Sequence, residues 1–262
     1  MTNDKFRNYD NVLPQVKECY LKARKFQSIE FYDYAVKKYC KFDKQASFWE
    51  LFNFLSNFVD LSDPDTNLSN HQHMYQTAEA IRKDGLPEWF QLVGLIHDLG
   101  KIIYKIGRKE DGTNMENQWA IVGDTFILGC EIPKEIVFPE FNCESKYKDY
   151  TKLGIYSEGC GLSNIKCSFG HDEYMYRLLK FNQIDLPEEA YYIIRYHSLY
   201  LWHTYNQYIH FENDKDKLMK EWVKKFQKYD LYTKNQNKID EEQAKKYYNK
   251  LVKKFFPDRI FW

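Results

Sequence analysis

An ionisable pair lies inside an apolar stretch of this chain, Leu95-Ile96-His97-Asp98-Leu99-Gly100-Lys101. A polar group on an apolar helix face needs a partner, because burial without one costs free energy. Four more imidazole or carboxylate residues stand within apolar or aromatic patterns of helical period: His73, His171, His197 and Asp230. The chain is therefore constrained to folds that bring such groups together, and four imidazoles with two carboxylates at one interior point would form a metal site.

Apolar periodicity predicts helices over most of the chain. Helical spacing dominates residues 11–58, and further helices are predicted at about 73–83, 88–103, 171–182, 187–200, 216–233 and 240–255. The segments between them are rich in turn residues, glycine or charge and fall at 60–70, 84–87, 107–118 and 119–168. Short β-like pieces, such as 135–138, are expected in the last of these. The 262 residues contain no internal repeat and no long linker, so we expect one mostly α-helical domain, 1–262.

Charge and apolar runs argue against two classes of partner. Lysine and arginine number 38, the same as aspartate and glutamate, and no basic stripe is present, whereas nucleic-acid binders carry a basic excess. No apolar run approaches the ~20 residues that span a bilayer, and the polar N-terminus lacks a signal-peptide core. The six cysteines form no Cys-x-x-Cys pair. We expect a cytoplasmic, monomeric protein with reduced thiols that binds neither nucleic acid nor membranes.

The first candidate ligands also have simpler structural explanations when each is taken alone. His73 opens its predicted helix, where a surface or capping histidine is the alternative, and His71 is a competing candidate two residues earlier. His97-Asp98 has the pattern of a helix-terminal polar pair, and a second such dipeptide, His171-Asp172, shows that the pairing alone says little. Adjacent residues also point about 100° apart on a helix, so both reach one metal only in a crowded interior.

The two later candidates are harder to explain without a partner. His197 shares a buried stripe with Ile193, and the alternative role there is a core histidine bonded to a carbonyl. Asp230 lies one turn after Phe226 on an apolar face, and the alternative is an ion pair with Lys234. Of all the candidates, Asp230 is the least compatible with a purely structural role.

The donor types restrict which metal site these residues could form. Imidazole and carboxylate without a thiolate pattern suit iron, manganese or zinc. Six ligands are too many for one tetrahedral zinc with an open position, but they fit two metals that share a bridging carboxylate. Such sites serve either hydrolysis through a bridging hydroxide or, with iron, the chemistry of dioxygen.

The flanking sequence of these residues is longer and more specific than any His-Asp dipeptide. It comprises HMYQTAEAIRK, LVGLIHDLGK, QWAIVGDTF, CGLSNI, SFGHDEY, IIRYHSLYLWHT and KYDLYTK. These strings resemble the inositol oxygenase family of the HD-domain superfamily, and the resemblance extends from Phe6-Arg7 to Phe261-Trp262. It implies an HD-domain-like helical bundle with a mixed-valent di-iron centre. The implied reaction cleaves the ring of myo-inositol with dioxygen to give D-glucuronate.

The resemblance also implies a ligand set and a substrate site. One iron would be held by His73, His97, Asp98 and Asp230, and a second by His171, His197 and the bridging Asp98, with two inositol hydroxyls completing it. The implied substrate contacts are Arg7, Asp60, Ser62, Lys101, Gly123, Asp124, His197, Ser198 and Lys234. Carboxylate acceptors and lysine, backbone and hydroxyl donors suit a neutral ring of hydroxyls. An N-terminal arm of about residues 1–25 would cover the substrate.

Asp98 and Lys101 are the implied catalytic residues. The charge of Lys101 could lower the pKa of an iron-bound hydroxyl, although the helix dipole alone favours a lysine at a helix C-terminus. Three features depart from the family's pattern, none of them at an implied ligand. They are a charged loop at 107–118 that looks longer than in animal relatives, Leu61 in place of an acidic residue, and Leu201 in place of a proline.

Two other functions compete with this interpretation. An HD-type metal-dependent phosphohydrolase would share the histidine and aspartate ligands, but it would have a basic phosphate pocket beside its metals. A non-catalytic regulatory protein with a relic site would be expected to have lost ligands, whereas all six matching positions are intact.

Overall fold

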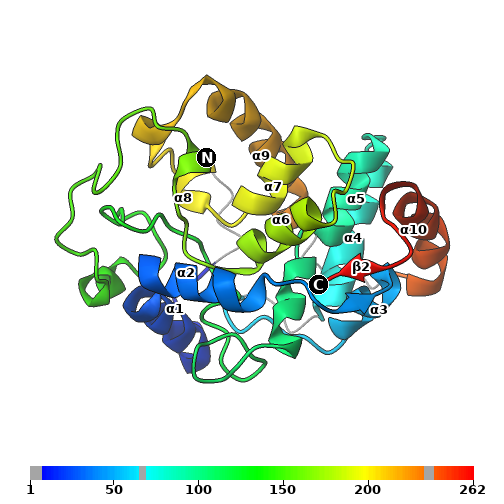
Figure 1. Cartoon of the computed structure of the whole chain (residues 1–262), viewed down its shortest axis with the longest axis horizontal. Helices are drawn as coiled ribbons and strands as arrows, with labels where there is room; N and C mark the ends of the chain where they lie inside the picture. The colour runs from blue at the N-terminus through cyan, green and yellow to red at the C-terminus, as the bar shows by residue number, and fades with distance from the viewer. Residues whose placement is uncertain (1–7, 65–68, 233–238) are drawn as a thin grey trace.

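The computed structural model describes residues 8–64, 69–232 and 239–262, which fold into helices and turns with one two-stranded sheet (Figure 1). The α-helices are α1 (Pro14–Phe26), α2 (Ile29–Tyr39), α3 (Phe48–Phe54), α4 (Asn70–Lys83), α5 (Glu88–Ile96), α6 (His171–Phe181), α7 (Glu188–Tyr196), α8 (Tyr200–His203), α9 (Asp214–Tyr232) and α10 (Glu241–Phe255). The 3-10 helices are η1 (Leu99–Lys105), η2 (Pro139–Glu144), η3 (Leu162–Asn164) and η4 (Ile209–Phe211), and the strands are β1 (Gln45–Ala46) and β2 (Ile260–Phe261). The predicted mostly helical class is confirmed. No helix in the described ranges has the length and apolar character that crossing a bilayer requires.

Helices α4, α5, α6, α7 and α9 surround the centre of the molecule. α4 packs against α5, α6 packs against η1 and α7, and α7 packs against α9. α5 is largely apolar and is buried from Phe90 to Ile96, as expected for a helix with neighbours on several sides. Gly94 permits the close approach of α5 to α4, because a Cβ there would lie 2.9 Å from the Cα of Ala78. α4, which carries His73, and α5, which His97 directly follows, are thereby held side by side.

A second glycine brings α6 against η1. A Cβ on Gly100 would lie 2.1 Å from the carbonyl oxygen of His171, a separation that close-packed atoms do not tolerate. Because residue 100 has no side chain, the first turn of α6 lies directly beside the backbone that follows Asp98. This contact sets the distance between the two ends of the site.

The β-structure lies elsewhere than the sequence predicts. β1 and β2 pair antiparallel and tie the C-terminus to the segment between α2 and α3. Between residues 119 and 168, turns and 3-10 segments replace the expected β-like pieces, apart from an isolated bridge between Ile127 and Cys167. Residues 135–138 form turns and bends. Prolines flank this segment on both sides, and each lacks the N–H that a strand ladder needs.

The charged loop after η1 is held against α2 by one carboxylate. Asp111 accepts hydrogen bonds from the hydroxyls of Tyr34, Tyr39 and Thr113 and from the ammonium of Lys38, the last at 2.9 Å. Burial raises the pKa of Asp111, but these donors outweigh burial and lower the pKa below its ordinary value. The loop is therefore anchored by an ionised side chain at neutral pH.

Asp111→Asn should lower the free energy of unfolding at neutral pH by about 1–2 kcal/mol, because an amide attracts Lys38 less and leaves donors unsatisfied. The folded-state pKa of Asp111 lies below its unfolded-state value of about 3.9. Its contribution to the free energy of unfolding is therefore present above the unfolded-state pKa and is lost as the pH falls through the folded-state pKa. Urea unfolding of both proteins from pH about 7 down to about 2, on both sides of the unfolded-state pKa, measures the difference. The difference should shrink toward acid pH, and one that stays constant would contradict the anchoring role. Asp149→Asn, at an exposed acid, is the control.

Candidate metal centre

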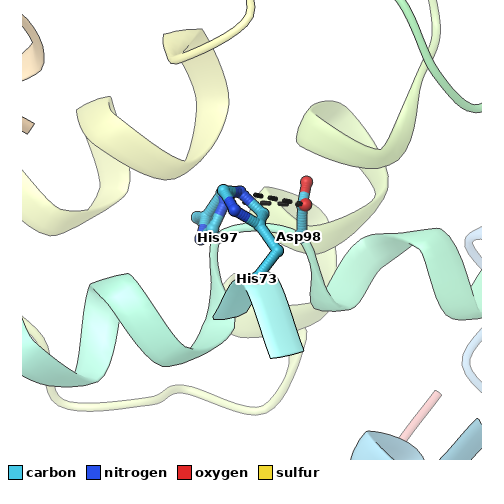
Figure 2. Close-up of side chains that lie close together, drawn as sticks. All are labelled: His73, His97 and Asp98. Atoms are coloured by element: carbon cyan, nitrogen blue, oxygen red, sulfur yellow. Dashed lines mark hydrogen bonds and ion pairs between the residues drawn. The ribbon is translucent and has the colours of Figure 1, made fainter. Parts of the chain in front are cut away.

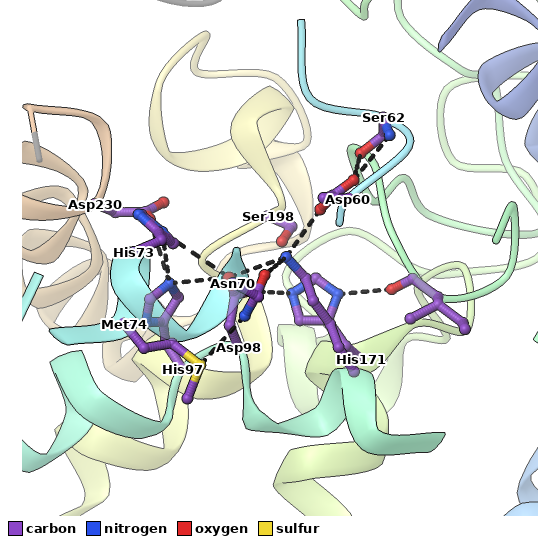
Figure 3. A network of polar contacts seen from close by, with 12 residues as sticks. Asp60, Ser62, Asn70, His73, Met74, His97, Asp98, His171, Ser198 and Asp230 are labelled. Atoms are coloured by element: carbon purple, nitrogen blue, oxygen red, sulfur yellow. Dashed lines mark hydrogen bonds and ion pairs between the residues drawn. The ribbon is translucent and has the colours of Figure 1, made fainter. Parts of the chain in front are cut away.

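The six predicted ligands meet at one buried point, and Figure 3 shows His73, His97, Asp98, His171 and Asp230 there. His73 lies in the first turn of α4, His171 is the first residue of α6, His197 directly follows α7, and Asp230 lies on α9. Each of the six is at most 9% exposed. These side chains therefore converge in the interior, and their roles as metal ligands stay predictions.

The remaining two ligands stand where the predicted helix over 88–103 is interrupted. α5 ends at Ile96, and the chain continues from residue 99 as the 3-10 helix η1. His97 and Asp98 occupy the junction, in which the change of helical geometry lets two consecutive side chains face the same interior point. This junction answers the difficulty that neighbouring side chains diverge on a regular α-helix.

The first group of ligand atoms surrounds the Nε2 atoms of His73 and His97, which are 3.2 Å apart. Oδ1 of Asp230 lies 2.9 Å from Nε2 of His73 and 3.3 Å from Nε2 of His97. Oδ2 of Asp98 lies 3.9 Å and 3.5 Å from the same two atoms (Figure 2). Four donors from three parts of the chain thus face one small volume.

The second group repeats this arrangement on the other side of Asp98. The Nε2 atoms of His171 and His197 are 3.2 Å apart. Oδ1 of Asp98 lies 3.2 Å from Nε2 of His171 and 3.9 Å from Nε2 of His197. The two oxygens of Asp98 therefore face two different imidazole pairs, which is the geometry of a bridging carboxylate.

Hydrogen bonds on the outer side of the rings set the direction of their lone pairs. Nδ1 of His97 lies 2.9 Å from the carbonyl oxygen of Gly94. Nδ1 of His171 lies 2.6 Å from that of Ile121, and Nδ1 of His197 lies 3.1 Å from that of Ile194. A carbonyl only accepts, so Nδ1 carries the proton and Nε2 offers a lone pair to the cluster.

In each imidazole pair the two Nε2 atoms are 3.2 Å apart, and their lone pairs repel one another unless a proton or a metal ion lies between them. Two neighbouring ligands at about 2.1 Å from one ion are separated by about 3 Å, so both pairs fit a metal. Without an ion a proton takes this place at His171. Burial lowers its pKa, but Asp172 and Asp98 outweigh burial and raise the pKa to about 10. The described residues fit two metal ions, and binding would release protons.

Lys101 is a buried member of the same cluster. Its Nζ donates to Oδ2 of Asp98 at 2.9 Å, to Oδ2 of Asp60 at 2.8 Å and to Oδ1 of Asn70 at 2.9 Å. Burial would lower the pKa of Lys101, but the two carboxylates outweigh it and raise the pKa above its ordinary value. The pKa of Asp98 is held well below its ordinary value, against burial, by Lys101 and the surrounding imidazoles. Lys101 is therefore a charged partner of the cluster, and it lies in the first turn of η1, away from the helix C-terminus at which a dipole would favour it.

A polar cavity opens beside the imidazole groups, and the predicted substrate contacts gather on its wall. The lining includes Asp60, Ser62, Lys101, Gly123, Asp124, His197 and Ser198. Ser62 donates to Oδ1 of Asp60 through both its backbone N–H and its hydroxyl, at 2.8 Å and 2.6 Å. Gly123 has a φ of 91°, which favours glycine. Arg7 and Lys234 lie outside the described residues.

Other lining residues were not predicted: Tyr9, Tyr20, Asp63, Pro64, Asn70, Gln76 and Tyr200. Asn70 and Gln76 lie three residues before and after His73, so helical spacing would have placed them on its face of α4. Tyr9 and Tyr20 bring the N-terminal segment to the cavity, because their hydroxyls are 3.0 Å apart and Tyr20 donates to Oδ1 of Asp124 at 3.2 Å. The family resemblance implied an N-terminal arm over the substrate, but no local signal singles out these two tyrosines.

The competing candidate His71 lies outside the cluster. Its Nδ1 is 3.0 Å from Oε2 of Glu241, and its ring centroid is 4.2 Å from that of Phe52. His71 therefore extends from α4 toward α3 and α10, while the side chain of His73 faces the other imidazoles.

Comparisons with known proteins agree with this geometry. A family model described as Myo-inositol oxygenase matches residues 13–262. The chain is 42% identical to the inositol oxygenase of Dictyostelium discoideum over 274 residues, which cover 99% of this chain and 90% of that protein. It is 41% identical to the inositol oxygenase of Sus scrofa, with 98% and 92% covered, and 43% identical to inositol oxygenase 4 of Arabidopsis thaliana, with 98% and 82% covered.

Asp98→Ala should abolish tight binding of both metal ions, because it removes the carboxylate oxygen that faces each imidazole pair. Equilibrium dialysis of the metal-free protein against Fe²⁺ without oxygen, followed by elemental analysis, measures the number of ions bound. We expect two per chain in the wild type and none retained in the variant. Asp149→Ala, at an exposed acid, should bind as the wild type does. Retention of both ions by Asp98→Ala would overturn the bridging assignment.

Proposed function

Because this chain belongs to the myo-inositol oxygenase family, we propose that it cleaves the ring of myo-inositol with dioxygen to give D-glucuronate. The observation that carries the proposal is the position of Asp98. Its two oxygens face two separate imidazole pairs, beside a polar cavity that Lys101 also lines. The enzyme is an oxygenase whose ligand set suits dioxygen chemistry as well as hydrolysis, and the family decides between the two.

The proposed cofactor is a mixed-valent pair of irons. His73, His97, Asp98 and Asp230 would hold one ion, and His171, His197 and Asp98 the other. When bound, such a centre supplies the one-electron steps that dioxygen requires and the Lewis acidity that activates an alcohol. Neutral imidazoles and carboxylates without thiolates are the donors that support iron in these positions.

The cavity wall supports binding of a neutral polyol. The carboxylates of Asp60 and Asp124 can accept hydrogen bonds from ring hydroxyls. Lys101, Ser62 and Ser198 can donate hydrogen bonds to these hydroxyls in exchange for the carboxylate and amide acceptors that they contact in this structure. Both signs of partner are needed because every hydroxyl is a donor and an acceptor. A cavity wall of this kind selects a substrate by the positions of its hydroxyl groups and not by its net charge.

Lys101 acts in this proposal as a fixed cation. Its pKa is raised and its three N–H groups already point at acceptors, so it donates hydrogen bonds and does not serve as a base. Placed 2.9 Å from Asp98, its charge stabilises the bridging carboxylate and any negative charge that develops on a substrate oxygen nearby. This supports its assignment with Asp98 as a catalytic residue.

The N-terminal arm of residues 1–25 belongs to the same proposal. Tyr9 and Tyr20 line the cavity, which supports a role for the arm in covering the substrate and excluding water. Substrate contacts by Arg7 and Lys234 stay predictions, as do a cytoplasmic location, a monomeric state and a single domain over 1–262.

A phosphohydrolase is the weaker candidate. Among the lining residues that fall in the described ranges, Lys101 is the only lysine or arginine, and it is already bonded to Asp60 and Asp98. Asp63, Asp124 and Asp230 add further carboxylates to the same wall. A phosphate group would therefore meet excess negative charge.

Oxygen uptake tests the activity directly. Iron-loaded protein should consume dioxygen when myo-inositol is added under air and should form glucuronate in equal amount. Phosphate release from nucleotides or phosphate esters without oxygen consumption would instead establish the phosphohydrolase. Inactivity in both assays, with two irons bound, would favour the regulatory protein.

Lys101→Ala should retain metal but lower turnover by about 10²–10³-fold, the size of effect that loss of one buried electrostatic contact has on a reaction. Lys105→Ala is the matched control, because Lys105 lies one turn further along η1 with an exposed side chain. Rates of oxygen uptake at saturating myo-inositol compare the two variants with the wild type. An unchanged rate in Lys101→Ala would remove this lysine from the catalytic site.

A further inference from the structure

Gln118 is a buried residue that joins two parts of the cavity wall, although it does not line the cavity itself. It is 2% exposed, and its Oε1 accepts a hydrogen bond from the backbone N–H of Leu61 at 3.1 Å. Its Nε2 donates to the carbonyl oxygens of Val59 and Met115, both at 3.0 Å. Two of these three contacts lie directly before and after Asp60 in the chain. Gln118 therefore fixes the backbone on both sides of a predicted substrate contact.

The backbone of Gln118 holds the second part of the wall. Its carbonyl oxygen accepts hydrogen bonds from the N–H groups of Ile121 at 2.8 Å and Val122 at 3.2 Å. These bonds close the turn that leads into Gly123 and Asp124, which also line the cavity. The side-chain contacts of Gln118 span 57 and 59 residues of sequence. One residue thus connects two wall segments that are distant along the chain.

The position of Asp60 matters because its carboxylate belongs to the polar wall. Oδ2 accepts a hydrogen bond from Nζ of Lys101 at 2.8 Å, and Oδ1 accepts one from the hydroxyl of Ser62 at 2.6 Å. Burial would raise the pKa of Asp60, but Lys101 and Ser62 outweigh burial and lower the pKa below its ordinary value. An ionised carboxylate accepts strong hydrogen bonds, and their strength falls steeply when the geometry is wrong. A shift of the turn around Asp60 would therefore weaken a contact with a ring hydroxyl, although none of the six predicted metal ligands lies in this turn.

We propose that Gln118 is a positioning residue for the substrate. It fixes the turn at residues 59–61 against the segment that carries Gly123 and Asp124, so that the two parts of the wall match one arrangement of ring hydroxyls. This inference rests on the proposed function for the identity of the substrate. Gln118 acts through Asp60 and does not touch the substrate. Its loss should raise the dissociation constant for myo-inositol more than it lowers turnover, because the predicted metal ligands and Lys101 stay in place.

Gln118→Met tests this role in the full-length protein, because methionine is also long and unbranched and its thioether is at most a weak acceptor. Calorimetric titration of the Fe²⁺-loaded protein with myo-inositol, without oxygen, measures the dissociation constant. It should rise about 10-fold, the factor that corresponds to the net contribution of about one hydrogen bond. Oxygen uptake at saturating myo-inositol should fall by less than about 3-fold, as expected for a residue that affects binding more than the reaction itself.

Gln91→Met is the matched control. Gln91 is 6% exposed and also bridges two segments, because its Nε2 donates to the carbonyl oxygen of Leu86 at 2.7 Å and its Oε1 accepts from the hydroxyl of Tyr247 at 2.9 Å. It lies on α5 and does not line the cavity. Both variants should lower the free energy of unfolding in urea, but only Gln118→Met should weaken the binding of myo-inositol. Equal weakening in both variants would overturn the proposal, as would an unchanged dissociation constant in Gln118→Met.

A double variant tests whether Gln118 acts through Asp60. Asp60→Ala alone should weaken the binding of myo-inositol. Addition of Gln118→Met should then raise the dissociation constant by less than about 2-fold further, because the group that Gln118 positions is already absent. A further loss as large as that of Gln118→Met in the wild-type background would contradict action through Asp60.

Failure of the proposed function has a different signature. Hydrogen exchange of the substrate-free protein reports on the backbone N–H of Leu61, which should exchange faster in Gln118→Met than in the wild type or Gln91→Met. A wild type that neither binds nor oxidises myo-inositol, but shows this difference in exchange, would contradict the oxygenase and support the contacts of Gln118. An active wild type with unchanged exchange and unchanged affinity in Gln118→Met would contradict the positioning role alone.

Discussion

The shared carboxylate of Asp98 is the contact on which the rest of the site depends. One of its oxygens faces the imidazoles of His73 and His97, and the other faces His171. A buried carboxylate in this position is stable only with positive charge around it, which Lys101 supplies in part. The helices that deliver these groups begin or end beside Asp98, so the packing of Gly94 and Gly100 serves the geometry of the site as well as the core.

The convergence of the ligands could be predicted from the sequence for a physical reason. An imidazole or carboxylate within an apolar helical pattern has few partners except others of its kind, and the wide spacing of His73, His97 and Asp230 along the chain leaves one interior as their meeting place. The family resemblance is confirmed over nearly the whole chain. The role of each individual residue could not be predicted in the same way, because only its contacts with distant segments distinguish a ligand from an exposed or capping residue.

The features that sequence could not supply depend on contacts between distant segments. In the sequence Asp172 is only the second residue of a dipeptide, and its 2.7 Å contact with Nε2 of His171 appears only in the structure. The β-like pattern at 135–138 gave a wrong prediction. Turns and bends bury the alternate apolar residues of this segment, and no neighbouring strand lies alongside it to pair with. Tyr9 and Tyr20 reach the cavity through tertiary packing that leaves no local pattern.

The distribution of the ligands over five separate segments also bears on how long the protein persists. Ions bound as proposed would be held at once by α4, α6 and α9 and by the residues that follow α5 and α7, and they would act as a non-covalent cross-link that only the native chain can form. Binding of this kind adds to the stability of the native state in proportion to the logarithm of free metal. The abundance of such a protein in a cell would therefore follow the supply of the metal that it binds, because chains left empty unfold more often and are degraded sooner.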